Sequence, residues 1–153
     1  MLEFIAARGS ASFLQTPAWA RVKSEWRGER VGFYDGDELT GVGLILYRKL
    51  PKLPRYLAYL PEGPVLDWSR DDIAEHFDAL VTHVKKRQAF AVRIGPAVVH
   101  RIWGTKTIKT AIADDNITSL TEVEPDVVTP EGEHVVSVLK QGGWITGETG
   151  QGF

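Results

Sequence analysis

The four histidines are the first candidates for catalysis or metal binding in this sequence. His76 and His83 stand seven positions apart, a spacing that puts both side chains on one face of a helix, two turns apart. This separation is too wide for one metal ion, and the neighbouring Asp and Thr positions favour two solvated surface histidines. His100 and His134 have no partner in the sequence. We therefore expect no metal site.

Other chemistries are excluded by what the sequence lacks. The chain has no cysteine, which excludes disulfides, zinc-thiolate and iron–sulfur sites, and a cysteine nucleophile. The motifs G-x-x-x-x-G-K-S/T, G-x-G-x-x-G and H-E-x-x-H do not occur, so nothing supports a P-loop, a dinucleotide site or a zincin. No serine, aspartate or glutamate lies within a recognisable nucleophile motif. We expect no cofactor, and these patterns nominate no catalytic residue.

Basic clusters offer local sites for an anion. The net charge of -2, from 18 Lys and Arg against 20 Asp and Glu, creates no global field that would attract nucleic acid. Arg48, Lys49, Lys52 and Arg55 follow one another with no acid between them, and residues 85–87 are all basic. The first cluster has two interpretations. It is either a solvated hairpin end whose cations protect an edge strand, or a site for an anionic ligand, a lipid head group or an RNA backbone.

The first half of the sequence predicts one helix followed by three strands. Thr16-Pro17 is an N-cap followed by a first-turn proline, and Trp19, Val22 and Trp26 recur at helical spacing, which predicts a helix over about 17–26. The run of β-branched and aromatic residues around the Asp-Gly-Asp turn at 35–37 predicts a hairpin over about 30–35 and 39–49. A third strand follows at about 56–60, between prolines.

The second half alternates helix and strand. Ser69, three residues ahead of Asp72, predicts a helix start, and apolar residues then recur at helical spacing up to the basic residues 85–87. A short apolar run at about 90–94 predicts a buried, central strand. Residues 100–113 fit either a helix or an irregular strand, and 117–120 fit a short strand. Thr129-Pro130 and Gly142-Gly143 bound a third helix, and residues 144–145 would start another strand.

This order predicts an α/β (α+β) fold, a mixed sheet with helices on both faces. The length of 153 residues, with 43% hydrophobic and 25% charged residues, fits one globular domain over residues 1–153. There is no secretory signal and no apolar stretch long enough to cross a membrane, so we expect a soluble, cytoplasmic protein. The element order resembles the GCN5-related N-acetyltransferase fold. Acyl-CoA members of that fold hold pyrophosphate on a glycine-rich loop, which the proline-bearing stretches 61–68 and 95–99 do not supply.

Four stretches together resemble a more specific family. They are FLQTPAWARVKSEW (13–26), YLPEGPVLDW (59–68), AFAVRIGP (89–96) and LKQGGW (139–144). In order and at compatible spacing they resemble the Fem family of non-ribosomal peptidyltransferases, aminoacyl-tRNA-dependent enzymes that add amino acids to the stem peptide of peptidoglycan precursors in bacterial cell-wall biosynthesis. The resemblance implies a protein of two acetyltransferase-like domains, of which this chain would be most of the first. The ending GETGQGF, where another strand should begin, agrees with truncation, so we expect the chain alone to be inactive.

The resemblance implies a substrate-binding set. The lysine that matches the family's contact to the precursor phosphates is Lys23, and Trp26 ends the same motif; from spacing alone, Lys23 is a snorkelling surface lysine and Trp26 is core. Glu62, Gly63 and Asp67 would lie at the rim of the substrate cleft, with a role for Asp67 at the helix start as the competing interpretation. Arg93, the sixth member, stands among apolar neighbours and favours a buried salt bridge.

Gly95 stands where the family commonly carries an Asp before Pro, so no general base can be nominated. The implied partners are UDP-MurNAc-pentapeptide or lipid II, aminoacyl-tRNA as co-substrate, and peripheral contact with the membrane surface. Two alternatives stay open. One is a CoA-dependent N-acetyltransferase with unusual loop chemistry, and the other is a non-catalytic binding module of the same fold. Acetyl-CoA binding would distinguish them.

Overall fold

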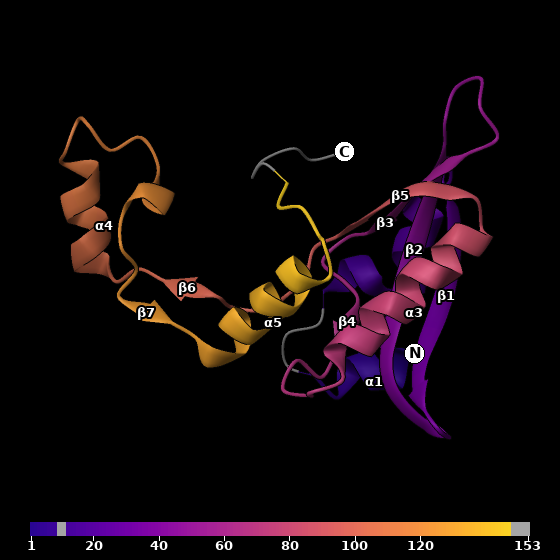
Figure 1. The fold of residues 1–153 in the computed structure, drawn as a ribbon. Coiled ribbons are helices and arrows are strands. Elements are labelled where there is room, and N and C mark those ends of the chain that lie inside the picture. The colour runs from indigo at the N-terminus through magenta and orange to yellow at the C-terminus, as the bar shows by residue number, and fades with distance from the viewer. Residues whose placement is uncertain (9–11, 148–153) are drawn as a thin grey trace. The chain divides into compact units, whose positions relative to one another are not determined.

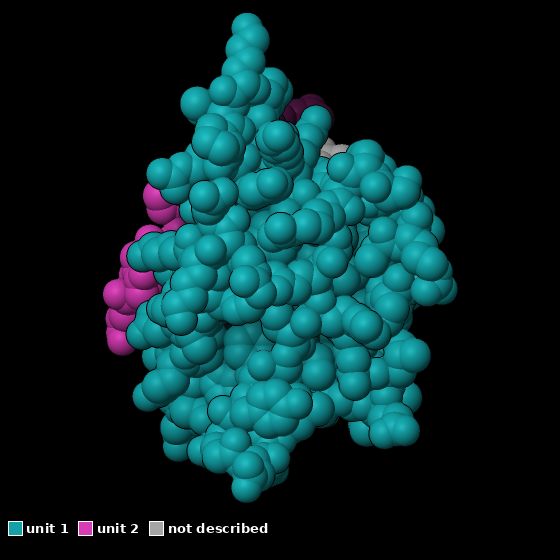
Figure 2. Space-filling view, turned by 90° about the vertical axis from the view of Figure 1, so that its right-hand side faces the viewer, with its two compact units in different colours: residues 1–97 teal, residues 98–153 magenta. Residues whose placement is uncertain are grey.

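The computed structural model describes residues 1–8 and 12–147. The chain groups into two compact units, residues 1–97 and 98–153 (Figure 2), and each is described here by itself. The expectation of a single domain over 1–153 stays a prediction. Most of the GETGQGF ending lies outside the described residues. Among the residues described, no helix combines the length and apolar composition needed to cross a membrane.

Unit 1 is built on a mixed sheet (Figure 1). Its strands are β1 (Arg27–Asp35), β2 (Glu38–Lys49), β3 (Tyr56–Leu60) and β5 (Ala89–Ile94), in the order β1-β2-β3-β5. The first two pairings are antiparallel, as hairpin connections require, and β3 pairs β5 in parallel because a helix connects them. The short strand β4 (Val65–Leu66) also pairs β2. The predicted mixed sheet is confirmed.

The helices of unit 1 are α1 (Leu2–Ala6), α2 (Pro17–Val22) and α3 (Ile73–Lys86), with a 3-10 turn at η1 (Phe13–Gln15). Successive strand residues face opposite sides of a sheet, and β1 shows which helix covers which side. A side chain on Gly28 would collide with Ala20 of α2, whereas the next residue, Glu29, meets His83 of α3 and Arg87, which directly follows α3. The sheet is therefore flanked by helices on both faces, as predicted.

Three details of unit 1 differ from the sequence-based expectation. The first helix ends at Val22 instead of reaching Trp26, which lies at the end of a turn just before β1. Ser69 does not cap α3, because its hydroxyl and backbone N–H both donate to Asp67. The strand β5 was expected to be central, but in the described structure it pairs only with β3, and Phe90 is left exposed.

Unit 2 contains β6 (Arg101–Ile102), α4 (Thr105–Ile112), η2 (Leu120–Glu122), β7 (Val127–Val128) and α5 (Pro130–Gln141), with β6 and β7 antiparallel. The predicted third helix is confirmed as α5: the Thr129 hydroxyl accepts from the N–H of Gly132, and Gly143 has the left-handed φ of 76° typical of a helix stop. Residues 100–113 hold both a two-residue strand and a helix. The strand expected at 117–120 is wrong, and residues 144–147 form no strand.

Candidate functional site

One buried amide organises the centre of unit 1. Strand β3 pairs with β2 at residues 46–49 and β4 pairs with it at 41–42, so the edge of β2 between them has no strand partner. The side chain of Gln15, which is 0% exposed, fills this gap. Its Oε1 accepts from the N–H of Leu44 at 2.8 Å, and its Nε2 donates to the carbonyl of Pro61. Gln15 thereby satisfies a buried backbone donor and ties the loop after β3 to the sheet.

The loop held by Gln15 carries two of the predicted site residues. Gly63 is buried, and a Cβ placed there would lie 2.3 Å from the side-chain Cδ of Gln15, so only glycine fits. The carbonyl of Gly63 accepts from the N–H of Gly95 at 3.2 Å, which joins the ends of β3 and β5. Glu62 is exposed, with a left-handed φ of 46° that a residue other than glycine rarely adopts. The carboxylate of Glu62 is therefore presented at the end of two parallel strands by a fixed loop.

The face of the sheet that α2 covers carries a row of rings and cations, which we call the cation–aromatic surface: Lys23, Trp26, Arg48, Tyr59 and Arg93. The Trp26 and Tyr59 rings lie 6.2 Å apart, with the guanidinium of Arg48 5.6 Å from the Trp26 ring and that of Arg93 5.9 Å from the Tyr59 ring. Strand pairing explains this arrangement, because Tyr59 is registered with Arg93 on β5 and with Leu46 on β2.

Lys23 lies at the C-terminal end of α2, with its ammonium 5.5 Å from the centre of the Trp19 ring. Trp19, like Tyr59, packs against the buried cluster of Trp26, Leu44 and Leu46. The salt bridges within the described part of the chain do not include Lys23. A half-buried ammonium that rests on an indole and has no carboxylate partner there can interact with an anion.

Asp67 is separated from this surface. It follows β4, which pairs with β2 at Gly41, whereas Tyr59 pairs with Leu46, so roughly 17 Å of strand lies between them. The Asp67 carboxylate accepts from the hydroxyl of Ser69 at 2.7 Å and from its N–H at 3.2 Å. These two bonds hold the pKa of Asp67 below its usual value. Asp67 thus forms the turn that leads into α3.

The structure therefore brings together Lys23, Trp26 and Arg93, places Glu62 and Gly63 on the adjoining loop, and sets Asp67 apart. Trp26 is 8% exposed and serves chiefly as packing under Arg48. Sequence reasoning did not single out Gln15 or Tyr59, and it placed Arg48 in the basic cluster of Arg48–Arg55, outside the substrate-binding set. Gln15 and Tyr59 lie within the stretches that carry the family resemblance, and this position was the available signal for both.

The opposite face of the sheet holds a separate polar cluster. The Glu29 carboxylate accepts from the Arg87 guanidinium at 2.7 Å and from the Tyr47 hydroxyl at 2.8 Å, and His83 Nε2 lies 3.2 Å from it. Arg87 contributes most to holding the pKa of Glu29 at about 2, with Tyr47 and His83 adding to it against the effect of burial. Burial, followed by the hydrogen bond to Glu29, raises the pKa of Tyr47. The cluster ties α3 to β1 and β2.

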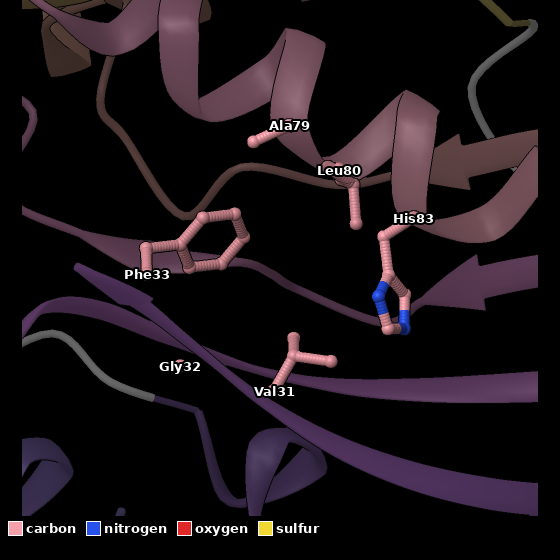
Figure 3. A pocket seen from close by; sticks show the side chains of 6 residues that line it. All are labelled: Val31, Gly32, Phe33, Ala79, Leu80 and His83. Atoms are coloured by element: carbon pink, nitrogen blue, oxygen red, sulfur yellow. The ribbon is translucent and has the colours of Figure 1, made fainter. Parts of the chain in front are cut away.

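Beside this cluster an open pocket of about 340 Å³ lies between β1 and α3 (Figure 3). Its lining is mainly apolar and consists of Val31, Gly32, Phe33, Ala79, Leu80 and His83. None of the six predicted site residues contributes to it.

His76 and His83 lie on the side of α3 that faces the sheet, and each contacts a residue of a strand. His76 is 8% exposed, with Nε2 2.8 Å from the Thr40 hydroxyl and Nδ1 2.8 Å from the Asp72 carbonyl. His83 is half-buried beside Glu29. The interpretation of both as solvated surface residues is therefore wrong. Within residues 1–8 and 12–147, no group of three or more His, Asp or Glu side chains is placed to hold a metal ion.

Comparison with known proteins relates this arrangement to a family. The chain is 34% identical over 98 residues to the lipid II:glycine glycyltransferase of Staphylococcus saprophyticus, an alignment that covers 62% of this chain and 24% of that protein. It is 35% identical over 98 residues to the lipid II:glycine glycyltransferase of Staphylococcus haemolyticus, covering 62% and 23%. The chain thus spans about a quarter of the length of these curated relatives.

The fold agrees with these similarities. The crystal structure of FemX superposes on this chain with a TM-score of 0.58 and 25% sequence identity, covering 91% of this chain and 28% of FemX. The sequence model of the FemAB family matches residues 2–123, which include the Gln15 anchor, the cation–aromatic surface and the loop after β3. This chain therefore belongs to the FemAB family.

Proposed function

We propose that this chain is the substrate-binding part of an aminoacyl-tRNA-dependent aminoacyltransferase that extends the stem peptide of a peptidoglycan precursor. The observation that carries the proposal is Lys23, an ammonium on the cation–aromatic surface with no salt bridge among the described residues. Two relatives are named lipid II:glycine glycyltransferases, so lipid II or its soluble counterpart UDP-MurNAc-pentapeptide is the proposed ligand. Both carry a pyrophosphate, which a lysine binds as a point charge.

The surface around Lys23 supports binding of the rest of such a molecule. Arg93 and Arg48 add cations within the same row, and Tyr59 between them offers an aromatic edge for an apolar or sugar face. Glu62, at the end of β3 and β5, can accept hydrogen bonds from hydroxyl or ammonium groups. The Gln15 anchor fixes the distance between this carboxylate and the sheet, because it binds both Leu44 and Pro61.

In the proposed reaction, the free amine of the precursor attacks the ester carbonyl of aminoacyl-tRNA, an amide bond forms, and the tRNA hydroxyl leaves with a proton. Residues of this chain would contribute by orienting the precursor, and positioning of this kind supplies a large share of the rate in two-substrate transfers. No general base is proposed from these residues, since Gly95 stands at the family's carboxylate position and uses its N–H to hold Gly63. We propose no cofactor, a cytoplasmic location and aminoacyl-tRNA as co-substrate.

The test is a titration of UDP-MurNAc-pentapeptide into the whole chain, followed by calorimetry or amide shifts. Lys23→Ala removes a charge-assisted contact and should weaken binding about tenfold or more. Lys106→Ala, an exposed lysine on α4, is the matched control and should bind as the original chain does. Acetyl-CoA is titrated in parallel. Binding of acetyl-CoA without binding of the precursor would overturn the proposal in favour of a CoA-dependent acetyltransferase, and binding of neither would leave a non-catalytic module.

A further inference from the structure

The end of the sheet at the turn between β2 and β3 gathers two basic clusters that are distant in the sequence. We call it the basic pole: Arg48, Lys49, Lys52, Arg55, Lys85 and Lys86. Lys49 pairs with Tyr56 across the turn, and the N–H of Tyr56 donates to the carbonyl of Gln88, just beyond the end of α3, at 3.2 Å. The C-terminal end of α3 therefore lies beside the turn (Figure 1).

The charge of the basic pole is opposite to that of the chain. All six cations are exposed, and they are a third of the 18 Lys and Arg of a chain whose net charge is -2. The acidic residues that the strand register brings to this end are Glu29, which Arg87 neutralises, and Glu25, in the turn before β1. A local concentration of positive charge of this kind attracts anionic surfaces over about one Debye length.

The turn itself has an apolar tip. The N–H of Leu50 donates to the carbonyl of Arg55 at 2.9 Å and closes the loop, which projects beyond the sheet at the top of Figures 1 and 2. Leu53, between Lys52 and Pro54, is 55% exposed. An exposed leucine at a projecting tip, surrounded by cations, has the chemistry of a membrane-interface anchor.

We propose that the basic pole docks this protein on an anionic phospholipid bilayer, with Leu53 inserted between the head groups and the six cations on the lipid phosphates. An RNA partner is disfavoured by the apolar tip of the turn, where Leu53 is 55% exposed. The exposed leucine has no partner on a phosphate backbone. This inference does not depend on the proposed transferase function, which is tested in solution without vesicles.

The experiment is co-sedimentation of the whole chain with vesicles of phosphatidylcholine and phosphatidylglycerol, and with vesicles of phosphatidylcholine alone. Lys49→Gln/Lys52→Gln should weaken partitioning onto anionic vesicles about fivefold per charge. Lys106→Gln/Lys109→Gln on α4 is the control of equal charge change, because both lysines are exposed. Leu53→Ala should reduce vesicle binding several-fold, whereas Ile112→Ala, an apolar residue 77% exposed on α4, should leave it unchanged. Binding to unacylated tRNA is measured with the same variants.

The inference is supported if the chain binds anionic vesicles strongly and phosphatidylcholine vesicles weakly, and if only the basic-pole and Leu53 variants bind the anionic vesicles less. Equal binding to both vesicle types would refute it, as would equal losses in the α4 controls. Tight tRNA binding that falls in Lys49→Gln/Lys52→Gln but not in Leu53→Ala, without vesicle binding, would reassign the basic pole to RNA.

Discussion

Replacing Gln15 by leucine tests whether one buried amide holds the site-bearing loop of this protein in place. Leucine has a similar volume, so the substitution removes hydrogen bonds with little change in packing. The N–H of Leu44 and the carbonyl of Pro61 would both lose their partner at the gap between β3 and β4. Because a Cβ on Gly63 would already touch the Gln15 side chain, water has little room to replace the amide.

The expected loss of stability follows from the unpaired Leu44 N–H and Pro61 carbonyl. A buried donor or acceptor left without a partner costs about 1–3 kcal/mol, so the free energy of unfolding of unit 1 should fall by about 2–5 kcal/mol in Gln15→Leu. Precursor binding should weaken as well, since the loop between Pro61 and Pro64 positions Glu62. A smaller effect on stability would mean that the loop is held chiefly by the packing of its two buried prolines.

Amide hydrogen exchange measured by NMR reports on the hydrogen bond of Leu44 to Gln15. Urea unfolding reports on the total free energy of unfolding. In the original chain, the Leu44 amide should exchange only on global unfolding of unit 1, and in Gln15→Leu it should exchange through local opening. Gln141→Leu is the matched control, because Gln141 is exposed at the end of α5 and bonds only to Ser137 in the described structure. A Leu44 amide that stays protected, together with a change in unfolding free energy below about 0.5 kcal/mol, would refute the reasoning.

Three further substitutions probe neighbouring features. Gly63→Ala forces a Cβ against Gln15 and should destabilise unit 1 by about 1–3 kcal/mol in urea unfolding; wild-type stability would show that the loop can move. Glu29→Gln weakens the pairing with Arg87 and should cost about 1–2 kcal/mol at neutral pH. Because the folded pKa of Glu29 is lowered from 4.5 to about 2, the difference from wild type should shrink as the pH falls from 4.5 to 2; a constant difference would contradict the ion pair. Thr129→Ala removes the α5 cap and should cost about 1 kcal/mol of unit 2 stability, seen as a lower melting temperature, and an unchanged value would argue against the cap.

The sequence determined the strands of unit 1 closely, because their signals are local. The Asp-Gly-Asp turn at 35–37 and the prolines that bound residues 56–60 bracket alternating and apolar runs, and the strands formed within two or three residues of the predicted ends. The helices α3 and α5 were equally clear from their periodicity. Trp26 was assigned to a helix, since its spacing from Trp19 is helical, but it packs under Arg48 at the start of β1 instead.

Partners across the sheet could not be predicted from spacing. Ser69 stands where a capping residue would, yet tertiary context turned it toward Asp67, and His76 was taken as solvated although it meets Thr40 on β2. Each of these pairings depends on which strands are neighbours and in which register. A local pattern carries no information on either.

The order of elements and the family resemblance follow from the amino-acid sequence, as do the positions of Lys23, Glu62 and Gly63 within recognisable stretches. Which of these residues share a surface depends on the tertiary structure. Parallel pairing of β3 with β5 places Arg93 beside Tyr59. Asp67 follows β4, which pairs with a different part of β2, and it therefore lies far from that surface. This separation arises because β2 is long enough to pair with two strands along the same edge, and the Gln15 amide satisfies the backbone group left between them.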